Sequence, residues 1–206
     1  MLTHIPTSKD KIQRAALTRM AHEGLGGATT ARIAATAGVA EGLIYCHFKS
    51  KDELMLAVYR RIKAEVYLAV MENYDENASP FERFAHLWRQ VFAAYRSDPD
   101  ALLFGQRFAE SHLMQKEGGR GNKDMERVLT KLRDDGVAVG VFKDIAPDLL
   151  IGLFYAPIVT LLRAENSGRY WDEDEITSAC GAACDSWRKA GSRTQTAAMS
   201  PPQQPS

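Results

Sequence analysis

The chain of 206 residues contains only three cysteines, Cys46, Cys180 and Cys184, which form neither a CxxC pair nor a framework of bridges. This scarcity argues against a disulfide-stabilised secreted domain and fits a reducing compartment. The first fifteen residues lack the apolar core of a signal peptide. The longest apolar run, Leu149 to Leu162, is short for a bilayer and contains Pro157, so it reads as a buried helix. We therefore expect a cytoplasmic protein with no membrane segment.

Signatures of enzyme chemistry are missing as well. The sequence has no Ser/His/Asp arrangement and no residue group with metal-ligand spacing. The glycine-rich loop at 118–122 follows no strand pattern and lacks a GK[ST] ending, so it is not a phosphate-binding loop. No strand periodicity and no internal repeat appear. We expect an all-α protein that is not an enzyme and that needs no cofactor and no metal.

The balance of charge is neutral overall but uneven along the chain. The 26 basic and 26 acidic residues give a net charge of zero, which alone argues against binding to a polyanion. Residues 1–63 hold ten basic and five acidic side chains, a net charge of +5, so the remaining residues carry −5. This distribution indicates that only the front of the chain meets a polyanion such as DNA.

The most specific stretch is Thr29–Phe48, which reads as two short helices joined by a tight turn. A hydroxyl at Thr29 or Thr30 can cap the first helix by accepting a backbone N–H. Gly38 ends that helix, and the second helix covers roughly residues 41–47. A glycine-containing turn of this length is the signature of a helix-turn-helix unit, whose second helix enters the major groove. A three-helix packing unit without DNA is the competing interpretation, which the local basic charge disfavours.

The segments on either side support the DNA-binding interpretation. Thr7 and Asp10 have capping-box spacing at the start of a first helix, which glycines 24, 26 and 27 are expected to end. A fourth helix begins after Ser50 and reaches about residue 73. Lys49 and Lys51 stand at its start, against the helix dipole, which makes better sense if both face phosphates.

The rest of the chain consists of further helices and a polar end. Apolar residues at helical period predict helices from Pro80 to Tyr95, from about 99 to 113, from 123 to 135, from 147 to 163 and from 172 to 189. From Gly191 onward the sequence is polar and rich in proline and glutamine, which is typical of disorder. The predicted domains are therefore a DNA-binding domain at 1–54, a helical effector-binding and dimerisation domain at 55–190, and a tail at 191–206.

Residues 12 to about 58 resemble the DNA-binding domain of TetR-family transcriptional regulators, whereas the C-terminal portion resembles the family only in its helical layout. The resemblance implies an all-helical homodimer that binds a palindromic operator on double-stranded DNA, mostly as a repressor, and releases it when a small-molecule effector enters the C-terminal domain. The matching positions are the first helix, Thr29, Thr30, Ile33, Ala34, Ala37, Gly38, Val39, Gly42, Leu43, Ile44, Tyr45, His47, Phe48, Lys49, Lys51, Glu53 and Leu54.

The same resemblance assigns residues to two tasks on DNA. Ala40 stands where the family more often has Ser or Thr, and Cys46 where a larger or more polar residue is frequent, so operator specificity is left open. Glu41 can accept from a cytosine amino group but repels phosphate. Contacts to the phosphate backbone are expected from Thr29, Thr30, Tyr45, His47 and Lys51, to which the helix-dipole argument adds Lys49. Base reading is expected from Ala40, Glu41 and Gly42 together with Cys46 and Arg32.

Two groups in the back of the chain, and Cys46 in the front, have more than one interpretation. Cys180 and Cys184 share a helix face and could bind metal or sense oxidation, but close packing is favoured because small residues surround them. Cys46 could alter the DNA face on oxidation, although a space-filling role is favoured. Eight residues are each expected to be core and jointly could enclose an effector pocket: Trp88, Phe92, Tyr95, Phe104, Phe108, His112, Phe154 and Tyr155.

The last two helices carry much apolar surface, which could complete a monomer core or form a dimer interface. We prefer the interface, because a two-fold operator needs a two-fold protein. The residues assigned to it are Leu150, Phe154, Ile158, Leu161, Ile176, Cys180, Ala183 and Trp187. The sequence thus predicts a ligand-responsive transcriptional regulator, and a helical regulator controlled by a protein partner is the alternative.

Overall fold

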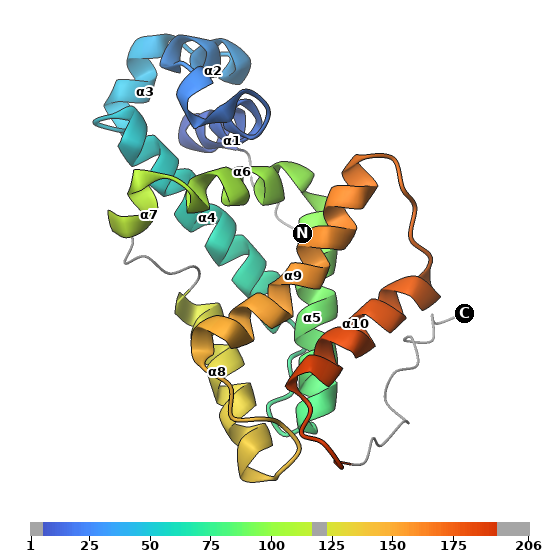
Figure 1. Cartoon of the computed structure of the whole chain (residues 1–206). Helices are drawn as coiled ribbons and strands as arrows, with labels where there is room; N and C mark the ends of the chain where they lie inside the picture. Colours follow the sequence, from blue (N-terminus) through green and yellow to red (C-terminus); the bar gives the residue numbers. More distant parts are fainter. Residues whose placement is uncertain (1–5, 117–122, 193–206) are drawn as a thin grey trace. The chain divides into compact units, whose positions relative to one another are not determined.

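Helices account for nearly all the regular structure in the computed structural model, which describes residues 6–116 and 123–192 (Figure 1). The prediction of an all-α chain is confirmed: within the described ranges the only β-type pairing is an isolated bridge between Phe142 and Arg188. Most of the predicted tail, 193–206, and the loop at 118–122 lie outside the described residues. The helices are α1 (Ser8–Gly27), α2 (Thr30–Ala37), α3 (Glu41–His47), α4 (Lys51–Met71), α5 (Pro80–Ser97), α6 (Pro99–Ala109), α7 (His112–Lys116), α8 (Lys123–Ala138), α9 (Pro147–Asn166) and α10 (Glu173–Trp187).

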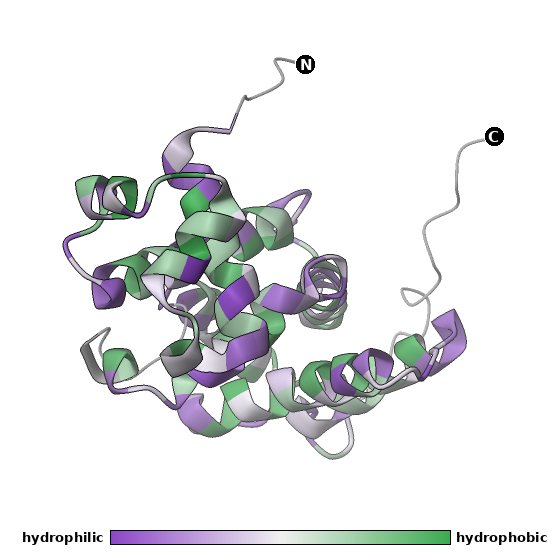
Figure 2. Ribbon diagram, turned by 90° about the horizontal axis from the view of Figure 1, so that it is seen from above, coloured by the Kyte–Doolittle hydropathy of each residue, from purple (hydrophilic) through white to green (hydrophobic). Residues whose placement is uncertain are grey.

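The chain divides into two compact units, which are not continuous in sequence. The first comprises residues 1–65 and 98–121, and the second comprises residues 66–97 and 122–206. By packing, the first unit therefore extends beyond the predicted DNA-binding domain at 1–54. The helices carry hydrophobic and hydrophilic residues along the same ribbon, as expected for amphipathic helices packed around a core (Figure 2).

Helix α1 organises the first unit by packing against α2, α3 and α6. Thr7 and Asp10 form the predicted capping box at its start. Its end differs from the expected stop, because Gly24 has a φ of 83° and bends the helix, which then continues to Gly27. The guanidinium of Arg107 on α6 donates to the Ala21 carbonyl over 3.1 Å at this bend. The glycine thus makes a kink that a side chain of α6 supports.

A polar seam joins α1 to α6 within the first unit. Thr18 Oγ1 donates to Asp100 Oδ2 over 2.7 Å, and His22 Nε2 lies 2.8 Å from the other oxygen of that carboxylate. Arg14 pairs with both Asp98 and Asp100. These contacts join residues about eighty positions apart in the chain, so no local sequence pattern predicts them.

Aromatic rings form the centre of the second unit, where α5, α9 and α10 pack on one another. The Phe84 ring meets Trp187 edge to face at a centroid distance of 4.9 Å and Phe154 at 5.4 Å. Phe142 packs on Trp187 and lies so close to Gly136 that a Cβ there would come within 2.2 Å of its ring. A glycine at 136 is therefore required by the close approach.

Arg83 is a buried charged residue of the second unit, with 4% of its surface exposed. Its Nη1 donates to Asp135 Oδ2 over 2.7 Å and its Nε to the Tyr74 hydroxyl over 2.9 Å. These bonds link α5 to α8, and hydrogen bonds from Lys131 and Arg83 lower the pKa of the Asp135 carboxyl. Buried charges persist when their polar atoms are paired in this way.

Candidate DNA-binding surface

The unit formed by α2 and α3 has helix-turn-helix geometry. Thr29 caps α2 by accepting from the Arg32 N–H over 3.3 Å. Gly38 takes the left-handed conformation, with φ 66° and ψ 37°, that the tight turn requires. Below the turn Ile33 and Ile44 are buried, with 0% and 1% of their surfaces exposed, and so fix α3 against α2. One face of α3 is thereby left open.

The predicted DNA-contacting residues all belong to the first unit and lie at or near its surface. Tyr45 is 53% exposed, which is unusual for an aromatic side chain that serves only packing. Gly42 adds no side chain to this face, and a Cβ built there would meet nothing within 4 Å. Eight of the predicted residues are exposed (Thr29, Arg32, Ala40, Glu41, Gly42, Tyr45, Cys46 and Lys49), and three are half-buried (Thr30, His47 and Lys51).

Three of these polar side chains make a network on the surface. Thr30 Oγ1 donates to Glu41 Oε1 over 2.6 Å, and the Tyr45 hydroxyl lies 3.2 Å from Thr30 Oγ1. The network joins the first residue of α2 to the first turn and the middle of α3. It therefore holds the two helices in register at the exposed face.

The side chains of His47, Lys51 and Arg32 have hydrogen-bond or ion-pair partners inside the first unit. His47 Nε2 lies 3.0 Å from Ser8 Oγ at the start of α1, and Lys51 Nζ donates to the Gly26 carbonyl over 3.2 Å. Arg32 pairs with Glu23 at 3.1 Å. Sequence reasoning found these residues but not their partners, because the partners are distant in sequence. Each of these contacts thus stabilises the packing of the helices around the exposed face of α3.

Lys49 differs, because its backbone is engaged instead: its N–H donates to Glu53 Oε2 over 2.7 Å. Ser50 Oγ accepts from the Glu53 N–H over 3.1 Å and so caps α4 as expected. The Lys49 side chain is exposed beside the end of α3. A cation at this place is available to a phosphate.

The residues predicted to enclose an effector pocket divide between the units. Phe104 and Phe108 are buried in the first, where Phe108 stacks on Tyr59 at a centroid distance of 4.1 Å. His112 also belongs there, but its side chain is 66% exposed and faces Asp52. In the second unit Tyr155 is half-buried, and Trp88, Phe92, Tyr95 and Phe154 are buried. Burial raises the pKa of Tyr95 to about 12, so its hydroxyl stays protonated at neutral pH.

The residues predicted for the dimer interface are buried within the protomer. The apolar stripes of α9 and α10 pack on α5 and on each other, so they face the core of their own protomer. Every predicted interface residue is buried in this way, namely Leu150, Phe154, Ile158, Leu161, Ile176, Cys180, Ala183 and Trp187. The opposite faces of the same two helices are exposed. That of α9 carries the small residues Gly152, Ala156 and Thr160, and that of α10 carries Ser178 and Ala182 beside the acidic Asp174, Glu175 and Asp185. Leu149 extends this surface and is 57% exposed.

Helix α9 is long and apolar enough to cross a membrane. Core helices of soluble proteins also reach this length and composition. Within the described ranges no group of three or more His, Cys, Asp or Glu residues could hold a metal ion. Cys180 and Cys184 are buried, and burial raises the pKa of each thiol to about 12. These two thiols are therefore poorly suited to thiolate chemistry at neutral pH.

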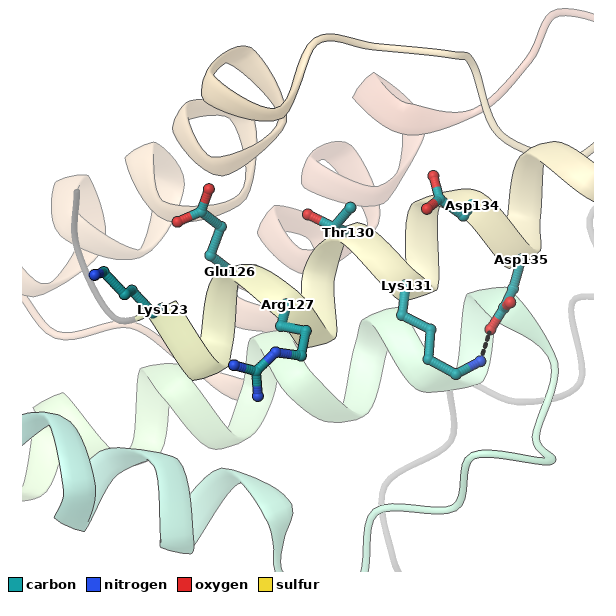
Figure 3. Close-up of a pocket in the computed structure, with 7 residues that line it drawn as sticks. All are labelled: Lys123, Glu126, Arg127, Thr130, Lys131, Asp134 and Asp135. Carbon is teal, nitrogen blue, oxygen red and sulfur yellow. Dashed lines mark hydrogen bonds and ion pairs between the residues drawn. The ribbon is translucent and has the colours of Figure 1, made fainter. Parts of the chain in front are cut away.

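A hollow along α8 in the second unit is lined by polar and charged side chains of that helix alone. Figure 3 shows Glu126, Thr130 and Asp134 projecting to one side of α8, and Arg127 and Lys131 to the other. Lys131 Nζ donates to Asp135 Oδ2 over 2.8 Å, one turn further along. Side chains with opposite charges at this spacing are typical of a solvated helix face.

The fold and the exposed α3 face define the chain as a helix-turn-helix DNA-binding protein. The family model of bacterial regulatory proteins of the tetR family matches residues 12–58, and a tetracyclin repressor-like C-terminal domain matches residues 59–189. Together they span most of the sequence, so the chain belongs to the TetR family and is a transcriptional regulator. Its family members typically bind operator DNA as dimers and respond to small molecules.

Known proteins similar to this chain are regulators from several bacteria. The HTH-type transcriptional repressor KstR2 of Mycolicibacterium smegmatis is 29% identical over 150 residues, 71% of this chain and 72% of the relative. A TetR-family regulator structure from Vibrio parahaemolyticus is 25% identical, with a TM-score of 0.73 over 89% of this chain and all of the other. The regulator FadR of Bacillus subtilis, solved with stearoyl-CoA, shares the fold at 18% identity and a TM-score of 0.69, covering 85% of this chain and 95% of FadR.

Proposed function

We propose that this regulator represses transcription in the cytoplasm by binding a palindromic operator as a homodimer, and that a small-molecule effector bound to the C-terminal domain releases it. The observation that carries the proposal is the open face of α3, with a bare Gly42, an exposed Tyr45 and an exposed carboxylate at Glu41. Such a face fits the major groove, where base edges can be read by side chains near the start of the helix.

The proposed contacts follow the position of each side chain around this face. Donors at the rim of α2 and α3 and the cations after α3 would meet phosphates, which fix the register of the protein on DNA. The exposed start of α3 would meet bases. The backbone set is Thr29, Thr30, Tyr45, His47, Lys49 and Lys51, and the base-reading set is Ala40, Glu41 and Gly42 with Cys46 and Arg32.

The dimer is proposed to form through the exposed faces of α9 and α10. Gly152, Ala156 and Thr160 follow one another at a spacing of four residues and so share one face of α9. A Cβ at Gly152 would meet nothing within 4 Å, so this face is open in the protomer. Thr160 Oγ1 donates to the Ala156 carbonyl over 2.9 Å, which leaves its methyl group for packing. Small side chains let a second copy of the helices approach closely.

Selection of bound DNA from a random library tests the proposed function. The protein is expected to enrich two inverted half-sites whose centres lie about one helical turn, or a small multiple of it, apart. Locating the selected site in the source genome would then identify the regulated genes. If the pool shows no enrichment, or only one half-site without its inverted copy, the proposal of a dimeric operator-binding regulator is wrong.

A fatty acyl-CoA is the first effector class to test, because the FadR structure similar in fold was solved with stearoyl-CoA. Adding stearoyl-CoA to the operator complex is expected to release the DNA, whereas coenzyme A or stearate alone would release less. The readout is fluorescence anisotropy of labelled operator. If operator binding is tight and no metabolite in a broad screen changes it, control by a protein partner becomes the better explanation.

A further inference from the structure

Glu41, the first residue of α3, accepts a hydrogen bond from a side chain that the proposed function assigns to a phosphate. Thr30 donates its hydroxyl proton to Glu41 Oε1, since an ionised carboxylate is only an acceptor. A threonine hydroxyl has a single proton, so the contact between Thr30 and the Tyr45 hydroxyl must be donated by Tyr45. The proton of Tyr45 therefore points to Thr30, and the proton of Thr30 points to Glu41.

The direction of these protons limits the contacts that Thr30 and Tyr45 can make with phosphate. Phosphate oxygens accept hydrogen bonds, so Thr30 and Tyr45 can grip the DNA backbone only by turning their protons away from the network. Glu41 then loses the donor that it has at 2.6 Å. A carboxylate taken from water without a donor is strongly unfavourable. Hydrogen bonding of Thr30 and Tyr45 to the DNA backbone is thus coupled to the group that replaces Thr30 as the donor to the Glu41 carboxylate.

We infer that Glu41 is a specificity-determining residue that makes tight DNA contact conditional on a cytosine in each half-site, an inference that rests on the proposed function. The amino group at cytosine N4 is the major-groove donor suited to an acidic side chain. Adenine offers an amino group too, but its neighbouring N7 is an acceptor that repels a carboxylate. Where the cytosine is present, Glu41 keeps a donor, and the hydroxyls of Thr30 and Tyr45 become available to phosphate.

The surroundings of Glu41 favour this role over general support of the helix. Gly42 has no side chain to shield the carboxylate, and Glu41 itself is exposed on the open face of α3. A stabilising interaction with the α3 dipole also exists, because Glu41 lies in its first turn and Ala40 provides no side-chain cap. That interaction concerns folding alone and predicts no preference for any base, so the two roles are separable by experiment.

The test compares the full-length protein with E41A, using the operator obtained by selection and copies of it with each base pair changed in turn. The wild type is expected to lose roughly 5- to 150-fold in affinity when one C·G pair of a half-site is replaced. E41A is expected to lose that preference at this position alone, and to bind DNA of random sequence more tightly than the wild type. E110A is the matched control, since it removes one carboxylate from the end of α6 in the same unit and should leave the base profile unchanged.

Two further variants give readouts that a purely structural role would not move. E41Q keeps the size of the side chain and is expected to shift the preference toward adenine, because a carboxamide matches adenine N6 and N7. Y45F is expected to weaken binding more in the E41A background than in the wild type, because there the Tyr45 proton is no longer part of a chain to Glu41.

The outcomes separate the inference from the function on which it rests. If the wild type selects an operator but E41A and E41Q keep its base profile, the inference is overturned while the proposed function stands. The same holds if E41A lowers the melting temperature and weakens binding equally at all sequences, because Glu41 would then be a structural residue. If the wild type enriches no DNA, the proposed function itself fails.

Discussion

Lys51 makes one contact within the protein and is proposed to make another with DNA. Its ammonium donates to the Gly26 carbonyl and is also proposed to meet a phosphate. We expect Lys51→Ala to weaken binding to all DNA sequences and to lower the salt slope by about 0.9 for each protomer, because one phosphate contact is lost. Affinity measured across a salt series checks this. If both affinity and slope are unchanged, the proposed docking is wrong.

Lys49→Ala is the control for that experiment. Lys49 contacts Glu53 through its backbone N–H, which the substitution retains. Its effect on the salt slope should therefore come without a loss of thermal stability. Lys51→Ala should lower the melting temperature slightly, because it also removes the bond that holds the end of α1.

The three thiols are expected to differ in reactivity. Burial raises the pKa of Cys180 and of Cys184 to about 12, so in the folded protein both stay protonated at pH 8. Cys46 is exposed on α3. Titration of the native protein with a thiol reagent at pH 8 should modify one cysteine per chain, and three after denaturation. Rapid modification of more than one thiol in the native protein would contradict the burial of α10.

The same two pKa values predict alkaline instability. Both thiols have folded-state pKa values above their ordinary value of 9.0, so the stability they contribute is present below pH 9. It is lost as the pH rises from 9 toward 12, because the unfolded chain ionises first. A C180A/C184A variant should therefore show a flatter decline of melting temperature above pH 9 than the wild type.

At the scale of the helices, α8 can approach Phe142 closely only because residue 136 is a glycine. A Cβ at Gly136 would lie 2.2 Å from the Phe142 ring, closer than atoms can pack. We expect Gly136→Ala to destabilise the protein by about 1–3 kcal/mol through overpacking. Gly105→Ala on α6 is the matched control, because a Cβ there meets nothing within 4 Å and alanine favours a helix. Chemical denaturation of both variants gives the comparison, and equal stability would contradict this packing.

The exposed faces of α9 and α10 make their own prediction. Ala156→Arg places a charge on the proposed interface without entering the core, since Ala156 is exposed in the protomer. We expect a folded monomer with weak operator binding, measured by analytical ultracentrifugation and circular dichroism. Val139→Arg serves as the control, because Val139 is 65% exposed at the end of α8. A dimeric Ala156→Arg protein would place the interface elsewhere.

In the proposed dimer, the DNA-binding domains of both protomers must bind one operator at the same time. Inserting five base pairs between the half-sites turns them to opposite faces of the duplex, since one helical turn spans about 10–10.5 base pairs. Affinity is expected to fall to that of a single half-site, because the second contact is no longer effectively intramolecular. Band-shift assays on both operators test this. Undiminished affinity would show that each protomer binds alone.

Local chemistry explains why much of the fold was predictable. The Thr7–Asp10 box, the Thr29 cap and the left-handed Gly38 act within a few residues, so the sequence displays them directly. The seam between α1 and α6 was missed because its partners are about eighty residues apart. The burial of the assigned interface residues within the protomer was not predictable for a related reason: an apolar stripe such as that of α10 shows that a surface is buried, but not whether its own chain or a partner covers it.

The seam between α1 and α6 bears on how hybrid regulators should be built. A graft of residues 1–65 alone would place Arg14, Thr18 and His22 opposite an α6 that lacks Asp98 and Asp100. It would also leave the Ala21 carbonyl at the kink without Arg107. Transferring residues 98–116 together with 1–65 keeps these contacts. A new operator specificity is thus transferred by moving two separate segments of the gene together. Side-chain contacts connect the two protein segments that they encode.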